Sequence, residues 1–227
     1  MPRRHSTIAL VLVLIGLILI SSAAAHQDHK DSSTNFEGRY NVLGTNPNGD
    51  RYSGTLEVIA HGGVYQFRWN AGTQYDGIGV KNGRLVAVAF TNGSVGTGCG
   101  VINYNILNDG TLDGVWGNWG TDGSGTERAK HVAGRGVEGQ YAATGTNPNG
   151  TPYQVNISVA AAGSGYRFVW SNNTEGFGIR RGNNLAVGFG GERCGFVAYE
   201  LKPDGSLDGV WGGYGSQQTG TEKAIRQ

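Results

Sequence analysis

Hydrophobic and polar residues alternate along most of the chain beyond position 37, and this period of two is typical of half-buried β-strands. Tyr65, Phe67 and Trp69 are separated by single polar residues, for example. Glycine-rich turns such as Asn108-Asp109-Gly110 lie between the alternating runs, as they do in β-hairpins. No stretch after position 25 has the apolar stripe of an amphipathic helix. The pattern therefore predicts an all-β protein made of short antiparallel strands.

Two segments of the chain, 38–130 and 139–227, are copies of one unit. The hexapeptide GTNPNG begins at Gly44 and again at Gly145, and the motif DGxLDGVW is followed by the tripeptide GTE in both copies. Each copy contains about eight alternating runs, a number that suits closure into a small barrel. We therefore predict two tandem, pseudo-symmetric barrel-like repeats with a linker at 131–138. The alternative is that both copies contribute strands to one shared barrel or sandwich.

The first 25 residues have the pattern of a secretory signal peptide. Arg3 and Arg4 precede an apolar run at 8–20, and Ala23-Ala24-Ala25 fits a cleavage site. An uncleaved membrane anchor is the alternative, because the apolar segment could just span a bilayer. We expect a secreted or periplasmic protein in which residues 26–37 form a disordered polar tail.

The composition narrows the class of partner. The whole chain has 18 Lys and Arg residues against 17 Asp and Glu residues, so its net charge is close to zero. Such a balance leaves no basic surface for a nucleic acid, and we expect no nucleic-acid partner. No metal-ligand spacing, nucleotide-binding motif or nucleophile motif stands out, so we expect neither a metal nor a cofactor.

Two carboxylates recur in each copy: Asp113 and Glu127 correspond to Asp208 and Glu222. A pair of carboxylates can act as acid and base. Neither copy combines its pair with a repeated histidine or serine, however, and a catalytic set is normally needed only once. A carboxylate that holds the fold together is needed in every unit, so we expect structural carboxylates and no enzymatic activity.

Aromatic residues provide the candidate binding residues. Trp116 and Trp211 recur at one position and either fill the core or line a barrel mouth that takes a small apolar or sugar ligand. Trp119 and its counterpart Tyr214 lie in glycine-rich stretches, where we expect them to be exposed.

The repeated hexapeptide is largely explained as a turn. In Asn46-Pro47-Asn48-Gly49 the proline presets the first turn angle and the glycine suits the left-handed region. Thr45 and Thr146, which precede the two turns, are not explained in this way. They are therefore candidates for a ligand loop.

Cys99 and Cys194 occupy the same position in the two copies. An exported protein can form disulfides, and a two-fold axis near these residues would bring the two cysteines together. In separate barrels each would instead be a small buried hydrophobic residue. The sequence leaves both possibilities open.

The motifs follow one another in the order Gly-x-Tyr, GTNPNG, Tyr-x-Phe-x-Trp, Gly-x-Gly, Asp-Gly-x-Leu-x-Gly-x-Trp and Gly-Thr-Glu between Gly38 and Glu222. This order resembles that of a group of small exported bacterial proteins with one or two such units. Most are of unknown function, and some carry an automatic label of fibronectin-binding protein. The resemblance implies an exported β-rich protein without known catalysis, and it supplies no binding residues. The Asp-Gly-x-Leu-x-Gly-x-Trp hairpin is also slightly similar to avidin and other small ligand-binding barrels.

Taken together, these features favour a non-enzymatic binding or adhesion-type module that acts outside the cytoplasm. Its partner would be an extracellular protein, bound by the glycine-rich loops and by Trp119 and Tyr214, with duplication raising the avidity. The alternative is a carrier of small ligands with aromatic-lined barrels. A membrane would be a partner only if the N-terminal segment is uncleaved.

Overall fold

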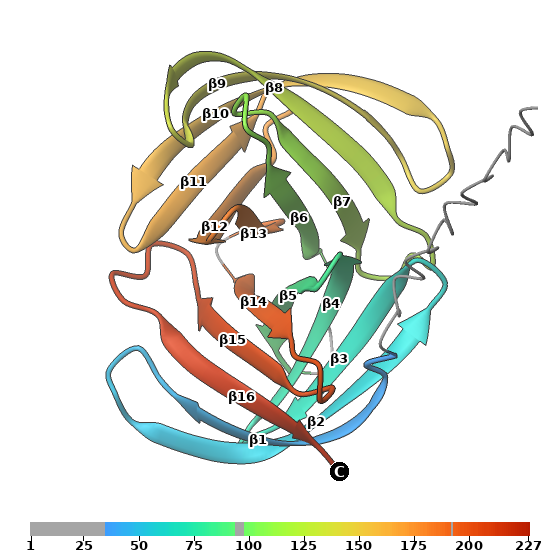
Figure 1. Ribbon diagram of the computed structural model, residues 1–227, viewed down its shortest axis with the longest axis vertical. Helices are drawn as coiled ribbons and strands as arrows, with labels where there is room; N and C mark the ends of the chain where they lie inside the picture. Colours follow the sequence, from blue (N-terminus) through green and yellow to red (C-terminus); the bar gives the residue numbers. More distant parts are fainter. Residues whose placement is uncertain (1–34, 94–97, 192) are drawn as a thin grey trace, which may run out of the picture. The chain divides into compact units, whose positions relative to one another are not determined.

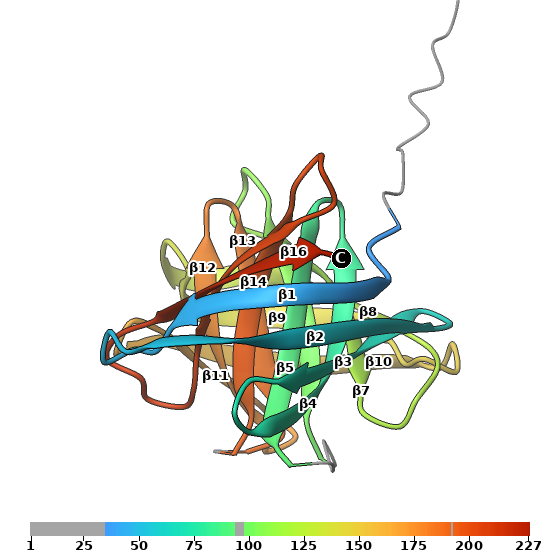
Figure 2. The same ribbon diagram turned by 90° about the horizontal axis from the view of Figure 1, so that it is seen from below.

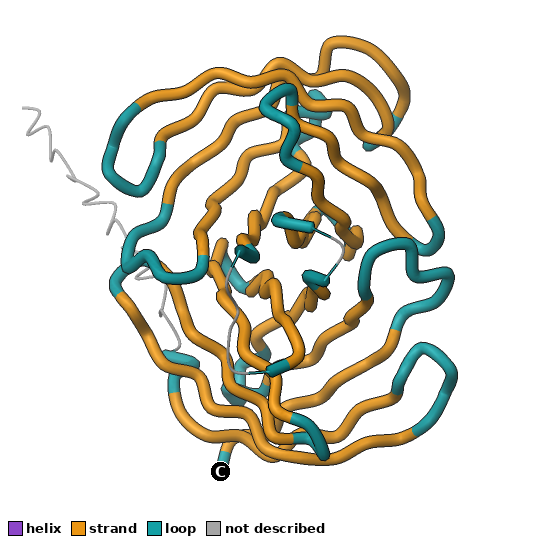
Figure 3. The backbone as a smooth tube through the Cα atoms, turned by 180° about the vertical axis from the view of Figure 1, so that it is seen from behind, coloured by secondary structure: helices purple, strands orange, loops and turns teal. Residues whose placement is uncertain are grey.

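The computed structural model describes residues 35–93, 98–191 and 193–227. The predicted signal peptide and most of the predicted tail lie outside the described residues. The described residues form sixteen β-strands, and no α-helix is found among them (Figure 3). Within these ranges, no helix is long and apolar enough to cross a membrane. The predicted all-β class is confirmed.

The strands follow one another in antiparallel hairpins along most of the chain. They are β1 (Gly38–Thr45), β2 (Arg51–His61), β3 (Val64–Asn70), β4 (Gln74–Asn82), β5 (Leu85–Asn92), β6 (Gly100–Ile106), β7 (Leu112–Asn118), β8 (Gly125–Arg135), β9 (Glu138–Thr146), β10 (Pro152–Ala162), β11 (Gly165–Trp170), β12 (Glu175–Arg181), β13 (Asn184–Phe189), β14 (Gly195–Leu201), β15 (Leu207–Gly212) and β16 (Gly220–Arg226).

These strands close into two antiparallel barrels of eight strands each (Figures 1 and 2). The first barrel has the strand order β1-β16-β15-β14-β5-β4-β3-β2, and the second has the order β10-β11-β12-β13-β6-β7-β8-β9. The prediction of two barrel-like units with eight strands each is therefore confirmed.

Neither barrel is built from one repeat alone. The first barrel combines β1–β5 of the first repeat with β14–β16 of the second, shown in blue to green and in red in Figure 1. The second barrel combines β9–β13 with β6–β8 in the same way. The two repeats thus exchange their last three strands. The structure has the two barrels that the tandem prediction required, and each barrel contains strands of both repeats, as in the alternative. The interval 131–138 is not a separate linker, because β8 runs to Arg135 and a tight turn leads into β9 at Glu138.

The exchange follows from strands that are apolar on both faces. In β5, Val86 and Val88 point into the core of the first barrel, whereas Ala87 and Ala89 belong to a second buried cluster. That cluster also contains residues of the second barrel, such as Phe177 of β12. A strand buried on both faces needs cover on both sides, and here the other barrel supplies the second cover.

One end of each barrel is closed by an apolar residue that precedes the first strand of a repeat, Phe36 before β1 and Val137 before β9. Phe36 is only 1% exposed, and its ring centroid lies 4.4 Å from that of Tyr65. The Tyr40 hydroxyl donates a hydrogen bond to the Phe36 carbonyl, and the Tyr141 hydroxyl donates one to Val137 in the second barrel. Residues 35–37, which the sequence assigned to a disordered tail, are therefore part of the first barrel, because the apolar Phe36 gains a buried site there.

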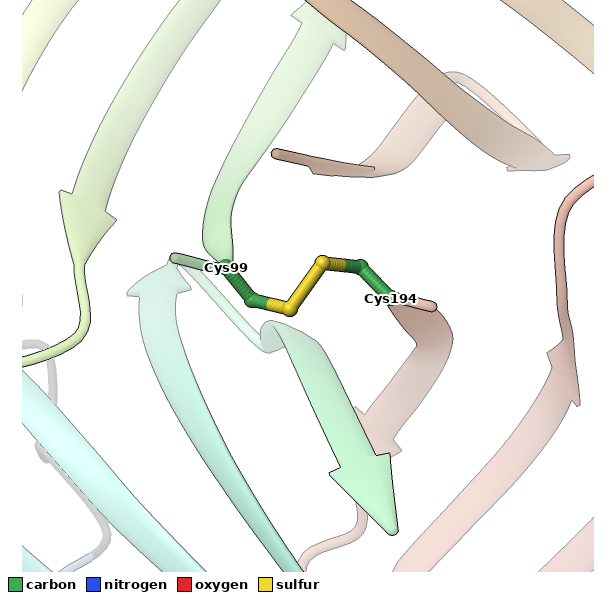
Figure 4. Close-up of a disulfide and its surroundings, with 2 residues drawn as sticks. All are labelled: Cys99 and Cys194. Carbon is green, nitrogen blue, oxygen red and sulfur yellow. A yellow bond between two sulfur atoms is a disulfide. The ribbon is translucent and has the colours of Figure 1, made fainter. Parts of the chain in front are cut away.

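A disulfide joins the two barrels. Cys99 precedes β6 and Cys194 precedes β14, and their Cα atoms are 5.9 Å apart in the bonded pair (Figure 4). Of the two possibilities left open by the sequence, the structure contains the bonded one. It forms because the strand exchange brings equivalent positions of the two repeats together.

Candidate binding sites at the barrel mouths

Each barrel has a cavity at the end opposite Phe36 or Val137, where the GTNPNG turn joins the first two strands. The first cavity has a volume of about 180 Å³, and we call it the first mouth. It is lined by Asn46, Tyr52, Trp69, Ala71, Tyr75, Phe90, Val197, Trp211 and Glu222. The second mouth, in the second barrel, has a volume of about 400 Å³. It is lined by Ile102, Trp116, Asn118, Glu127, Asn147, Tyr153, Gln154, Val155, Trp170, Ser171, Asn172, Thr174 and Phe189.

A buried glutamate lies in the wall of the first mouth. Glu222 of β16 is 6% exposed. Its Oε1 accepts hydrogen bonds from the Tyr199 hydroxyl and from Trp69 Nε1, the latter at 3.0 Å, and its Oε2 accepts one from the Tyr52 hydroxyl at 2.8 Å. The donors come from β14, β3 and β2, so this one carboxylate connects four strands of the barrel.

The second mouth repeats this arrangement with other residues. Glu127 of β8 is 4% exposed. Its Oε1 accepts hydrogen bonds from the Tyr104 hydroxyl and from Trp170 Nε1, the latter at 3.2 Å, and its Oε2 accepts one from the Tyr153 hydroxyl at 3.0 Å. The sequence predicted a structural carboxylate at this position. Its hydrogen-bond partners went unrecognised, because most of them come from the other repeat.

The glycine before each turn makes room for one of these tyrosines. Gly44 and Tyr52 are cross-strand partners, and a Cβ atom on Gly44 would lie 2.2 Å from the Tyr52 ring. Gly145 has the same relation to Tyr153, with a distance of 2.5 Å. The absence of a side chain lets each tyrosine ring lie across the neighbouring strand, where its hydroxyl reaches the glutamate.

The threonines before the two turns also have structural partners. The Thr45 hydroxyl lies 2.8 Å from that of Thr221, and the Thr146 hydroxyl lies 2.8 Å from that of Thr126. Neither Thr45 nor Thr146 lines a mouth, whereas the asparagines that follow them do. The hexapeptide thus contributes to each site through its glycine and its first asparagine.

The two glutamates have no cationic partner. Among the residues that the structure describes, no lysine, arginine or histidine forms an ion pair with Glu127 or Glu222. Burial raises the pKa of both carboxyls, and the hydrogen bonds from tyrosine and tryptophan oppose this effect. Burial, followed by the charge of the nearby glutamate, also raises the pKa of Tyr52 and Tyr153. Each site is therefore a carboxyl group surrounded by neutral donors.

Each carboxylate keeps one acceptor position that no residue of the described ranges uses. A carboxylate offers about four acceptor positions, and Glu222 uses two on Oε1 and one on Oε2. Glu127 uses its positions in the same way. The position left in both cases is on Oε2, in a residue that lines the mouth.

An indole N–H without a partner lies in the wall of each mouth. The Nε1 atoms of Trp116 and Trp211 are buried, and neither makes a hydrogen bond within the described part of the chain. Each indole opposes the rise in the pKa of the adjacent tyrosine, Tyr153 or Tyr52, although the pair lacks the geometry of a hydrogen bond. An unsatisfied buried donor costs about 1–3 kcal/mol, and each of these indoles is a donor that the described part of the chain leaves unused.

The structure separates the four aromatic candidates that the sequence provided. Trp116 and Trp211 line the two mouths, which was one of the two positions considered for them. Trp119 is half-buried and borders a different groove on the outside of the first barrel, beside Arg68. Tyr214 is 38% exposed, and its ring centroid lies 6.1 Å from that of Phe177. Trp119 and Tyr214 therefore do not belong to the mouths.

The repeated carboxylates do not come together as pairs. Asp113 is half-exposed and forms an ion pair of 3.2 Å with Arg128, whereas Glu127 points into the barrel. Asp208 pairs with Arg181 at 2.8 Å on the outside of the first barrel. In residues 35–93, 98–191 and 193–227, no cluster of three or more His, Cys, Asp and Glu residues could hold a metal ion.

Sequence alone contained a partial signal for the mouths. Tyr52 and Tyr153 follow the hexapeptide at the same distance, and the GTE tripeptide contains both glutamates. What the sequence could not show is that strands of different repeats pair, which brings Tyr52 and Glu222 together.

Comparisons of this chain with protein-family models, with curated proteins and with solved structures found no match.

Proposed function

We propose that the protein binds small organic molecules in its two barrel mouths. The observation that carries this proposal is the repetition, in both barrels, of an aromatic cavity around a buried glutamate with an unused acceptor position. Small-molecule sites are typically concave and mostly apolar, with a few polar groups that fix the orientation of the ligand. Both mouths have this character.

The size of the cavities limits the ligand. Sites for drug-sized molecules have volumes of about 300–1,000 Å³. The second mouth, at about 400 Å³, lies at the low end of this range, and the first, at about 180 Å³, lies below it. The expected ligands are therefore small, such as a short amine or alcohol, or a single sugar ring for the larger cavity.

Binding of an extracellular protein stays a prediction from the sequence, as does export. Trp119 and Tyr214, the residues expected to form a protein-binding surface, border different grooves. No contact of either residue favours a protein partner over solvent. The aromatic cavities, in contrast, suit a small molecule, which favours a carrier of small ligands.

The test is a thermal-shift screen of the purified protein against small amines, alcohols, aromatic compounds and monosaccharides, followed by titration of the tryptophan fluorescence. A ligand at 100 times its Kd stabilises the folded state by about 2.7 kcal/mol, which is a measurable rise in Tm. We expect each active compound to change the fluorescence of Trp116 or Trp211, because these indoles line the cavities.

Matched tryptophan variants locate the binding. Trp211→Phe should reduce the fluorescence response of ligands of the first mouth to the part that comes from Trp69, and Trp116→Phe should reduce that of ligands of the second to the part that comes from Trp170. Trp119→Phe, outside both cavities, should leave both responses intact. A screen without any active compound, or responses that depend only on Trp119, would contradict the proposal.

A further inference from the structure

The two mouths differ at their rims, and the difference points to the ligand of the first one. In the first mouth Tyr75, at the start of β4, lines the cavity. The equivalent position in the second mouth, just before β12, is Thr174, and its neighbours Ser171 and Asn172 also line the cavity. The first mouth is therefore the smaller and the more aromatic of the two.

Five aromatic rings surround the first mouth, compared with four in the second. The Phe90 ring lies at the centre of the group, with centroid distances of 5.8 Å to Trp69, 5.9 Å to Tyr75 and 6.2 Å to Trp211. Tyr52 extends the group, at 6.3 Å from Trp211. Most of these rings meet edge to face or tilted, so they form a curved wall rather than a flat stack.

The same cavity contains a carboxylate without a counter-charge. Glu222 lines the first mouth, and its three hydrogen-bond donors are neutral groups of Tyr52, Trp69 and Tyr199. A buried carboxylate is costly unless it is paired with a cation or becomes neutral. None of the described residues that line this cavity is a lysine, arginine or histidine. When Glu222 is ionised, a positive charge beside it would have to come from a bound ligand.

We propose that the first mouth binds a small organic cation, with its ammonium group held by the five aromatic rings and paired with Glu222. Aromatic cages of this kind recognise quaternary ammonium groups, because each ring presents a negative face to the cation. The inference rests on the proposed function, since it names the class of ligand for one of the two cavities. It assigns no cation to the second mouth, where polar side chains replace the fifth ring.

The composition of the cavity disfavours the other ligand classes. An anion would be repelled by Glu222 when this residue is ionised. A sugar needs several polar partners. Apart from Glu222 and the hydroxyl and indole groups of the rings, Asn46 is the only polar side chain among the described residues that line the first mouth. A neutral apolar molecule would leave the acceptor position on Glu222 unused.

Two ligands of nearly equal shape test the inference. Choline carries a trimethylammonium group, and 3,3-dimethylbutan-1-ol replaces it by a neutral tert-butyl group. Titration of the purified protein, followed by tryptophan fluorescence and calorimetry, should give a Kd for choline that is at least about tenfold lower than for the neutral alcohol, because only choline gains from the rings and the carboxylate. Equal affinities would overturn the cation assignment.

Two variants in the cavity and one control outside it test whether the preference for choline over the neutral alcohol arises in the first mouth. Glu222→Gln should reduce the preference for choline to less than about threefold, because it removes the charge and keeps the shape. Glu57→Gln makes the same change on the outside of the first barrel and should leave the preference intact. Tyr75→Thr copies the residue of the second mouth and should raise the Kd for choline several-fold. It provides the test should Glu222→Gln fail to fold.

The outcomes separate this inference from the proposed function. Binding of the neutral alcohol as tightly as choline contradicts the inference and supports small-molecule binding. Choline affinity unchanged by Glu222→Gln or Tyr75→Thr also contradicts the inference, because the cation then binds elsewhere. Binding of neither compound overturns the inference, and the broad screen then decides the proposed function.

Discussion

The two barrel mouths contain the same types of residue in the interior and different residues at the rim. Both contain a buried glutamate that accepts hydrogen bonds from two tyrosines and one tryptophan. At the rim, Tyr75 of the first mouth corresponds to Thr174 of the second, and the cavity volumes are about 180 and 400 Å³. The glutamate and its hydrogen-bond donors are the same in both copies, whereas the position of Tyr75 and Thr174 at the rim differs.

Each mouth is also assembled from both repeats. In the first mouth Tyr75 and Phe90 belong to the first repeat, whereas Trp211 and Glu222 belong to the second. The first five strands of a repeat supply the variable rim, and the last three supply the glutamate and one tryptophan. A change in one repeat therefore affects both cavities, but it alters different parts of them.

The largest expected effect comes from removing one repeat. A chain of residues 35–135 contains β1–β8 but lacks the strands that complete its first barrel. We expect it to form a homodimer in which two copies exchange their last three strands, with a disulfide between the two Cys99 residues. Both mouths of this dimer would carry Tyr75, so the difference between the cavities would disappear.

Light scattering and non-reducing electrophoresis check this expectation. Cys99→Ser in the same half-chain is the matched control, because it removes the disulfide and keeps the exchanged strands. A half-chain that folds as a monomer, with β5 paired to β6 in one barrel, would show that the exchange is not required for closure.

A smaller effect is expected from alanine at the glycines that support the tyrosines. In Gly44→Ala the three atoms nearest to the new Cβ would all belong to the Tyr52 side chain, the closest at 2.2 Å, and this ring could turn aside at the cost of its hydrogen bond to Glu222. We expect a loss of about 1–3 kcal/mol in the free energy of unfolding. In Gly145→Ala the Cβ would also lie 2.2 Å from the backbone oxygen of Thr126, which cannot turn aside, so the loss should be larger.

Urea denaturation of the two variants measures this difference. Gly213→Ala is the control, because its new Cβ would have only the Ser216 hydroxyl near it, at 3.8 Å, and a change within about 0.5 kcal/mol is expected. Equal losses for Gly44→Ala and Gly145→Ala would mean that the tyrosine rings, and not the backbone, determine the cost in both barrels.

The sequence predicted the strands better than their partners. Alternation in segments such as Tyr65–Trp69 predicts a strand whatever it pairs with, and the repeat predicts that both copies fold alike. The exchange of strands depends on whether β5 pairs with β6 of its own repeat or with β14 of the other. These two strands have the same local pattern, so the sequence does not distinguish them. The one local clue was the run Val86–Phe90, which is apolar on both faces.

The candidate site was predictable in part because its residues recur in both repeats. Trp116 and Trp211 were identified because they recur, and the structure places both in the mouths. Trp119 and Tyr214 recur as well, but they follow β7 and β15 in loops, where alternation no longer indicates which way a side chain points. The environment of Glu222 depends on the pairing of β16 with β1 and of β1 with β2. This pairing brings Tyr52 within hydrogen-bond distance of Glu222, although the two residues are 170 positions apart in the sequence.

The smallest expected effect is a pH dependence carried by the two glutamates. Burial raises the pKa of Glu127 and Glu222 in the folded protein above that of the unfolded chain. The folded state then binds the proton more tightly, so this stabilisation is complete below the unfolded pKa of about 4.5 and is lost as the pH rises through the folded pKa. Each unit of pKa difference corresponds to about 1.4 kcal/mol.

Glutamine variants isolate this contribution, because glutamine keeps the shape of the side chain and does not titrate. The free energy of unfolding of the original protein minus that of Glu127→Gln, or of Glu222→Gln, should fall as the pH rises above about 4.5. The neighbouring phenols do not interfere, because the pKa values of Tyr52, Tyr104, Tyr153 and Tyr199 are raised above their usual value of 10.0. A difference that stays constant with pH would contradict a raised pKa for the two glutamates.

Measuring the pH dependence of the free energy of unfolding with and without choline compares the two mouths. A cation bound beside Glu222 favours the ionised carboxylate and lowers its pKa, so saturating choline should flatten the pH dependence that Glu222→Gln removes. The pH dependence carried by Glu127 should keep its slope, because the second mouth has Thr174 in place of the fifth ring. Equal flattening in both barrels would show that the shared glutamates, and not the divergent rims, select the ligand.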